Sequence, residues 1–253
     1  MIEIKDLKKS FGEKEVLRGV SGVFERGKTS LVIGSSGSGK TVLMKCMVGL
    51  IQPTEGHVIY NRNIDFVAIE EKERKEIRKE IGMLFQGSAL FDSMTVEQNI
   101  MFPLNMFTNM THKEKLTQVN SCLDRVNLKG SNKLVPSELS GGMKKRVGIA
   151  RAIVLNPKYL FCDEPNSGLD PQTSILIDEL IYEITQEFNI TTIVNTHDMN
   201  SVIGVGDYIM FLHKGEKNWE GNRKNVLLEG SKELNDFIFA SKFLQEIKTK
   251  MVI

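Results

Sequence analysis

Residues Thr29–Thr41 read TSLVIGSSGSGKT, and this stretch decides the fold. The run Thr29–Ile33 is continuously apolar, which is typical of a strand in a parallel sheet that is covered on both faces. The next residues, Gly34–Thr41, match the phosphate-binding pattern G-x-x-x-x-G-K-[ST]. Lys40–Val48 has the pattern of a helix, so the motif has the strand before it and the helix after it that its function requires.

This loop predicts binding of nucleotide phosphates. Glycines let backbone N–H groups converge on phosphate oxygens, and the following helix directs its positive end toward them. We expect Lys40 to reach the β- and γ-phosphates and Thr41 to offer a hydroxyl to Mg²⁺. The alternative, a glycine-rich turn without a ligand, is disfavoured by the flanking strand and helix. The expected phosphate-contacting residues are Gly34, Ser35, Ser36, Gly37, Ser38, Gly39, Lys40 and Thr41.

A pair of carboxylates follows a second apolar run. Tyr159–Glu164 reads YLFCDE, so the pair lies at the end of a predicted strand, where parallel sheets bind ligands. Asp163 suits a contact to Mg²⁺, and Glu164 suits the polarisation of an attacking water. The alternative is an acidic pair that only opens the loop before Pro165. The phosphate loop in the same chain favours the catalytic interpretation.

The order of the remaining segments predicts an α/β fold. Strand-like and helical runs alternate before residue 86 and after residue 156, which is the pattern of a parallel sheet, whereas residues 87–155 are mainly helical. We expect one domain with a nucleotide-binding core at 1–86 and 156–225, an inserted helical lobe at 87–155 and a helical tail at 226–253. Within the tail, Phe237–Ile253 carries an apolar stripe that packs either on its own core or on a second copy.

Composition excludes several classes of protein. The chain has 253 residues, 41% of them hydrophobic and 26% charged, and a formal net charge of +1. That balance lacks the basic excess of a nucleic-acid-binding protein, so we expect no nucleic-acid partner. The three cysteines form no CxxC pair. We expect no signal peptide, because Met1–Ser10 has no apolar core, and no membrane span, because no apolar window is long enough. We expect a cytoplasmic protein that reaches a membrane only through a partner.

A second helix start also suits an anion. Leu139–Arg146 reads LSGGMKKR, and Ser140, Gly141 and Gly142 stand where a helix is expected to begin. One phosphate loop is enough for one nucleotide. The second start is therefore predicted to serve a nucleotide that another copy of the chain holds.

LSGGM resembles the LSGGQ signature of the ABC transporter ATPases, with Met143 in place of the usual glutamine. Other residues follow in the order of that family. Phe11 resembles the aromatic that stacks on adenine, Gln86 the Q-loop glutamine, Ser167–Asp170 (SGLD) the D-loop, and His197 the switch histidine. Each alone would be interpreted as a core, loop or surface residue. The order in which they occur makes the family role the better interpretation.

The resemblance implies a fold, a reaction and partners. The fold class is α/β: a P-loop NTPase core with an N-terminal antiparallel β region and an inserted helical lobe. Two copies would pair head to tail, so that each ATP lies between one copy's phosphate loop and the other's LSGG helix. Glu164 would orient the water, His197 would contact the γ-phosphate and Asp170 would reach across the dimer. Gln86 would connect the γ-phosphate and Mg²⁺ to the lobe that contacts a membrane permease.

Two passages resemble a narrower group. Phe85–Ile100, FQGSALFDSMTVEQNI, and LSGGMKKR are similar to the ATPases of Mla-type bacterial systems, which move phospholipids across the cell envelope together with MCE-domain proteins. The sequence departs from many relatives at Ser35 and Asn166. The resemblance implies a peripheral location on the cytoplasmic face of the inner membrane. Alternatives are an ABC ATPase for an amino acid, drug or lipoprotein, a soluble ABC ATPase acting on nucleic acid or the ribosome, and a P-loop kinase or GTPase.

Overall fold

The computed structural model describes residues 1–240. These residues form two compact units. The first unit contains Met1–Phe24, Thr29–Ala68 and the described residues from Asn195 onward. The second unit contains Glu25–Lys28 and Ile69–Val194. The second unit therefore includes all of the residues 87–155 that we expected to be helical.

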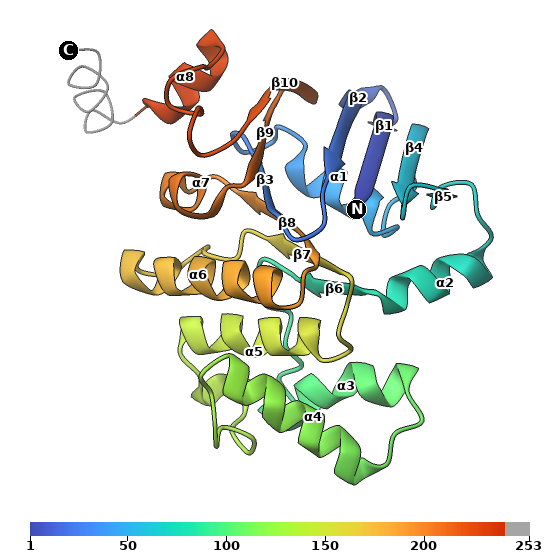
Figure 1. Ribbon diagram of the computed structural model, residues 1–253, viewed down its shortest axis with the longest axis vertical. Coiled ribbons are helices and arrows are strands. Elements are labelled where there is room, and N and C mark those ends of the chain that lie inside the picture. The colour runs from blue at the N-terminus through green and yellow to red at the C-terminus, as the bar shows by residue number, and fades with distance from the viewer. Residues whose placement is uncertain (241–253) are drawn as a thin grey trace. The chain divides into compact units, whose positions relative to one another are not determined.

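An antiparallel sheet forms the N-terminal part of the first unit (Figure 1), as the sequence predicts. Its central strand pairs on both sides, because Ile2 lies opposite Phe24 of one neighbour and Tyr60 of the other. All three of these side chains are fully buried, so the sheet has an apolar face. The strands, in the order in which they lie, are β2 (Lys14–Phe24), β1 (Ile2–Phe11), β4 (Glu55–Tyr60) and β5 (Ile64–Asp65).

The predicted strand Thr29–Ile33 is β3, and all five of its residues are buried. It pairs in parallel with β9 (Tyr208–His213), and β9 pairs antiparallel with β10 (Glu216–Gly221). Among residues 1–240, three helices complete the first unit: α1 (Lys40–Met47), α7 (Met199–Val205) and α8 (Lys232–Ile238). The apolar stripe that we expected over Phe237–Ile253 falls mostly outside the described residues.

A parallel sheet also supports the second unit. β6 (Ile81–Leu84) and β7 (Tyr159–Asp163) pair in parallel, and β8 (Thr191–Thr196) lies beside β7. β8 carries the chain from the second unit into the first. The helices of the second unit are α2 (Glu71–Lys79), α3 (Val96–Phe107), α4 (His112–Arg125), the 3₁₀ helix η1 (Pro136–Glu138), α5 (Gly141–Ile153) and α6 (Pro171–Glu187).

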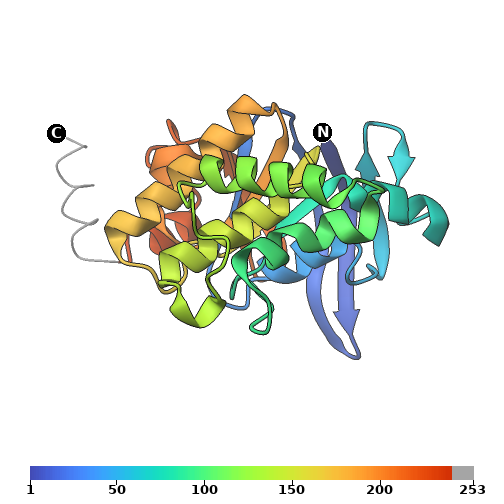
Figure 2. The ribbon, with the colours of Figure 1, turned by 90° about the horizontal axis from the view of Figure 1, so that it is seen from below.

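Side-chain caps set the starts of α3, α4, α5 and α6 in the second unit. Thr95 and Thr111 each form a capping box, in which the threonine and the third helical residue satisfy each other's backbone N–H. Asp170 caps α6 in the same region of the chain as the predicted D-loop. Helix α5 contacts α3, α4 and α6, as Figures 1 and 2 show. The helix that begins at LSGG is thus packed from several sides and has little freedom to move alone.

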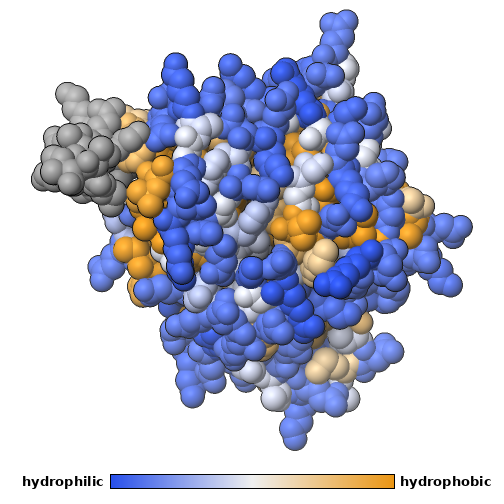
Figure 3. Space-filling model, turned by 45° about the horizontal axis from the view of Figure 1, so that its top comes forward, coloured by the Kyte–Doolittle hydropathy of each residue, from blue (hydrophilic) through white to orange (hydrophobic). Residues whose placement is uncertain are grey.

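The face of the molecule in Figure 3 is largely hydrophilic, and hydrophobic residues gather in separate areas between the charged side chains. No helix within residues 1–240 combines the length and the apolar character that crossing a membrane requires.

Candidate nucleotide-binding and hydrolysis site

The phosphate loop in the first unit requires glycine at two positions. A Cβ at Gly34 would lie 2.4 Å from the carbonyl oxygen of Leu212. Gly39 has a φ of 108°, and its Cβ would lie 2.9 Å from a methyl carbon of Leu17. The backbone of Leu212 beside Gly34 and the packed side chain of Leu17 beside Gly39 leave no room for a larger residue at either position. The glycines that the motif prescribes are therefore the residues that this fold accepts.

Lys40 lies over the same loop. Its side chain is only 7% exposed, and its Nζ donates to the carbonyl oxygens of Gly34 at 2.8 Å and Ser35 at 3.2 Å. The first helical turn that follows has no side-chain cap, with Gly39 as the N-cap residue. A helix start without a side-chain cap and a nearby ammonium group together suit a phosphate. The residues of the loop thus fit the nucleotide that the sequence predicts.

The first unit also contains Phe11 and His197. Phe11 ends β1, is 49% exposed and has the Nζ of Lys9 4.9 Å from its ring centre. His197 is exposed and follows directly on β8. The next residue, Asp198, caps α7 by accepting from the N–H of Asn200 at 2.8 Å. An accessible aromatic face and an accessible imidazole are therefore present at the predicted positions.

The two carboxylates lie in the second unit, at the carboxyl end of β7. Asp163 ends the strand and is 5% exposed, whereas Glu164 begins the loop and is half-buried. Glu164 has a φ of 50°, a left-handed conformation that is uncommon for residues other than glycine. The pair is thus divided between a rigid strand and a sharp turn. The turn gives the Glu164 side chain a different direction from that of a residue in the strand.

Gln86 follows β6 and is exposed, and its loop is fixed by backbone contacts that the sequence analysis missed. Arg151 of α5 donates to the carbonyl oxygens of Ser88 at 2.6 Å and Ala89 at 2.7 Å. The fully buried Asn99 of α3 accepts from the N–H of Phe91 at 2.8 Å and donates to the carbonyl oxygen of the same residue. These contacts explain why a polar asparagine occupies the apolar side of α3.

Lys145 is a third residue that the sequence analysis missed. It lies on α5, is 5% exposed and donates to the backbone carbonyl oxygens of Gln86 and Glu164. The signal was its position: Gly142 and Ile149, three residues before and four after it, both lie on the buried side of the helix. A lysine in that register must be paired inside the protein.

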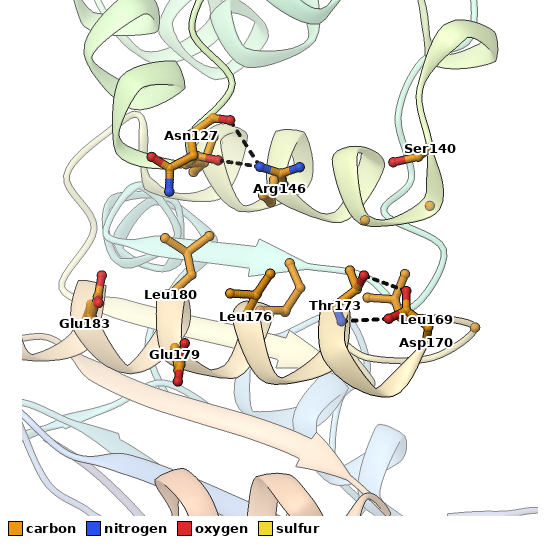
Figure 4. Close-up of a pocket in the computed structure, with 15 residues that line it drawn as sticks. Asn127, Ser140, Arg146, Leu169, Asp170, Thr173, Leu176, Glu179, Leu180 and Glu183 are labelled. Atoms are coloured by element: carbon orange, nitrogen blue, oxygen red, sulfur yellow. Dashed lines mark hydrogen bonds between the residues drawn. The ribbon is translucent and has the colours of Figure 1, made fainter.

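The LSGG segment forms the start of α5, as predicted. Ser140 is the N-cap, and its Oγ accepts from the N–H of Met143 at 3.3 Å. A Cβ at Gly142 would lie 2.6 Å from the methyl carbon of Thr173, so this glycine allows α5 to approach α6. Figure 4 shows this start facing the first turn of α6 across a cavity of about 520 Å³.

Asp170 lies at the same cavity (Figure 4). Its carboxylate accepts from the N–H of Thr173 at 2.9 Å and from the hydroxyl of the same residue at 2.5 Å. The side-chain hydrogen bond from Thr173, followed by the backbone one, lowers the pKa of Asp170 below its usual value. The second unit thus holds Gln86, Asp163, Glu164, Asp170 and the Ser140–Gly142 start, while the first holds Phe11, the phosphate loop and His197.

The family model described as ABC transporter matches residues 17–167, which include the phosphate loop, the LSGG helix and the carboxylates. The chain belongs to the ABC transporter family. It is 38% identical to the methionine import ATP-binding protein MetN of Campylobacter jejuni over 97% of this chain and 78% of that protein. It is also 37% identical to the probable ribonucleotide transport ATP-binding protein mkl of Mycobacterium leprae, over 94% of this chain and 68% of that protein.

A solved structure supports the same assignment. An ATP-binding cassette in a dimeric post-hydrolysis state, bound to ADP and phosphate, superposes with a TM-score of 0.80. It is 31% identical, and the match covers 88% of this chain and 99% of that one. The predicted fold class, an α/β P-loop NTPase with ABC ATPase architecture, is confirmed. This ABC ATPase binds nucleotide and couples ATP hydrolysis to transport.

Proposed function

We propose that this ABC ATPase drives phospholipid transport across the bacterial cell envelope, as a head-to-tail dimer bound to a membrane permease. An MCE-domain protein would complete the system on the far side of the membrane. The observation that carries this proposal is an apolar groove in the second unit. The groove is partly built from Phe85–Ile100, the segment whose sequence resembles the lipid-transport ATPases.

The proposed roles in hydrolysis follow from the site. Lys40 would bind the β- and γ-phosphates, and Phe11 would stack on the adenine. Thr41, Gln86 and Asp163 supply the hydroxyl, amide and carboxylate oxygens that Mg²⁺ accepts as ligands, and Mg²⁺ when bound would neutralise phosphate charge. Glu164 would orient the attacking water and accept its proton, and His197 would contact the γ-phosphate.

Two features support a head-to-tail dimer. The chain has a second helix start suited to an anion, in addition to its phosphate loop. Ser140 and Gly141 at that start are exposed, so a second copy can reach them. The related cassette bound to ADP and phosphate is itself described as a dimer. We propose that Ser140, Gly142 and Asp170 contact the nucleotide site of the other copy, so that closure excludes water and allows hydrolysis.

The groove beside the Gln86 loop is the proposed permease site. It has a volume of about 400 Å³, and its walls come from α2, β6, the Gln86 loop, α3 and α5. Phe91 and Phe102 pack within it with ring centres 4.9 Å apart. Phe85, Phe91 and Phe107 keep 36%, 41% and 44% of their surface exposed, which is unusual for such large apolar side chains. We propose that an amphipathic helix of the permease inserts its apolar face here. This contact would hold the ATPase on the cytoplasmic face of the membrane.

The cargo is proposed from the same segment. An ATPase subunit joins a particular transporter by binding its permease. Residues at the groove therefore indicate the cargo more directly than residues at the nucleotide site. Phe85, Ala89 and Phe91 belong both to the groove and to the lipid-system-like run. The two relatives described above are named for methionine import and for ribonucleotide transport. An amino-acid transporter is therefore the competing function.

Copurification tests the partner and the cargo class. The tagged chain, expressed in its own cells, would be extracted from membranes in mild detergent and its companions identified by mass spectrometry. We expect a permease together with an MCE-domain protein. A permease with a periplasmic amino-acid-binding protein would support the competing function instead. Phe91→Asp should abolish the copurification if the groove is the docking site, whereas Phe188→Asp, a similarly exposed phenylalanine outside the groove, should not.

Glu164→Gln tests the proposed catalytic base. Because glutamine cannot accept the proton, we expect hydrolysis to fall about 100-fold or more while ATP binding is kept and a closed dimer accumulates. Phosphate release and size-exclusion chromatography with ATP would measure the two effects. The matched control is Glu73→Gln on the exposed side of α2. Near-normal turnover of Glu164→Gln would remove this residue from the role.

A further inference from the structure

Lys145 lies inside the protein, where its positive charge requires hydrogen-bonding partners. It is 5% exposed, and burial lowers its pKa, although Cys162, Glu164 and Asp163 act in the opposite direction. A buried ammonium group needs hydrogen-bond acceptors to replace the water that it has lost. The identity of those acceptors indicates what the residue does.

The acceptors belong to two loops that are far apart in the sequence. Nζ donates to the carbonyl oxygen of Gln86, in the loop after β6. It also donates to the carbonyl oxygen of Glu164 at 3.2 Å and to Oγ of Ser167 at 3.2 Å, both in the loop after β7. Ser167 Oγ in turn donates to the Gln86 carbonyl oxygen at 3.4 Å. The three N–H groups of the Lys145 ammonium can thus donate to three different oxygens.

The backbone of Glu164 gives this contact a specific task. Its φ of 50° is uncommon for a residue with a Cβ, so the conformation persists only where the surroundings hold it. Lys145 holds the carbonyl oxygen of that residue. Since the lysine projects from α5, the contact links the turn at Glu164 to the helix that begins with Ser140.

We propose that Lys145 is a positioning residue that fixes the backbone of Gln86 and Glu164 relative to the LSGG helix, so that the three move as one body. The proposal rests on the roles proposed above for Glu164 and Gln86. Lys145 would touch neither nucleotide nor water. It would act by keeping the carboxylate of Glu164 in register with the helix start that contacts the other copy's nucleotide.

Lys145→Met tests this role, because methionine keeps nearly the same volume and length but has no donor. We expect kcat to fall roughly 10- to 100-fold, the loss that a displaced catalytic group causes, with the ATP dissociation constant within about twofold of wild type. Lys145→Gln retains N–H donors and should recover much of the loss. Lys144→Met is the matched control, because Lys144 is the preceding residue of α5 and is half-buried.

Hydrogen–deuterium exchange provides a readout that does not depend on hydrolysis. In Lys145→Met the amides of residues 86–89 and 164–168 should exchange faster together, while those of α1 keep their protection. If Lys145→Met exchanges like wild type at both loops, the positioning proposal is wrong. If Lys145→Met fails to fold, the same two measurements on Lys145→Gln decide. If both loops exchange faster while hydrolysis stays within about twofold of wild type, Lys145 fixes the two loops but the catalytic roles proposed for Glu164 and Gln86 are wrong.

Discussion

Two helix starts in this ABC ATPase look alike in sequence and differ in structure. α1 begins at the lysine of GSGK and α5 begins at the first glycine of LSGG, so each start combines serine with glycine. At α1 the N-cap is Gly39, and no side chain caps the helix. At α5 the N-cap is Ser140, whose hydroxyl already accepts from the N–H of Met143. The two starts therefore offer an anion different sets of donors.

The glycines at the two starts are also required for different reasons. Gly39 has a φ of 108° and touches the core side chain of Leu17, so both its backbone and its surroundings exclude a Cβ. Gly142 is a helical residue whose missing Cβ makes room for a methyl group of Thr173. The first start is shaped to enclose a ligand in its own chain. The second is shaped by helix packing and leaves its exposed side for another molecule.

The largest expected effect concerns Lys40, which lies over the phosphate loop at the start of α1 and has no counterpart at the start of α5. Lys40→Ala removes a charge-assisted donor to phosphate, so we expect ATP binding to weaken roughly 100-fold. Isothermal titration with ATP and Mg²⁺ would measure it. Lys45→Ala, in the last turn of the same helix, should bind like wild type. Retained tight binding in Lys40→Ala would contradict the phosphate-loop assignment.

Alanine substitutions at Gly39 and Gly142 test whether the two glycines are required for different reasons. Gly39→Ala should destabilise the fold by about 1–2 kcal/mol from the left-handed backbone alone, with a further cost from Leu17. Gly142→Ala conflicts only with a methyl group, so Thr173→Ser in the same chain should restore most of its stability. Thermal unfolding of the single and double variants would show this. If Thr173→Ser gave no recovery, the packing account of Gly142 would be wrong.

The smallest expected effect concerns the cap of α5. Ser140→Ala should lower stability by about 1 kcal/mol, because the N–H of Met143 loses its acceptor. Ser140→Thr keeps the hydroxyl and should be close to wild type. Chemical denaturation would give the free energy of unfolding, and ATP binding to the isolated monomer should not change. A loss of monomer binding as large as that of Lys40→Ala would show that the two starts do not differ in the way proposed.

Short, contiguous sequence motifs predict much of the fold and of the candidate site. The phosphate loop, the carboxylates after β7 and the LSGG start are each contiguous motifs whose conformation follows from glycines, caps and an apolar strand. For that reason β3 and β7 lie close to where the sequence places them. The antiparallel strands β1 and β2 extend through many polar residues, because their ladder hydrogen bonds continue there. The pattern of apolar residues alone does not show such pairing between strands.

The sequence by itself determined the family and the reaction and predicted the residues that would bind phosphate, because these depend on short segments whose chemistry is local. Only the tertiary structure revealed that Lys145, Arg151 and Asn99 hold the loop of Gln86, and that Lys145 also holds Glu164. Their partners are mostly backbone carbonyl oxygens, which every residue carries and no motif records. A polar side chain on the buried side of a helix signals that such a partner exists, and the packing of α3 and α5 against the loops decides which one it is.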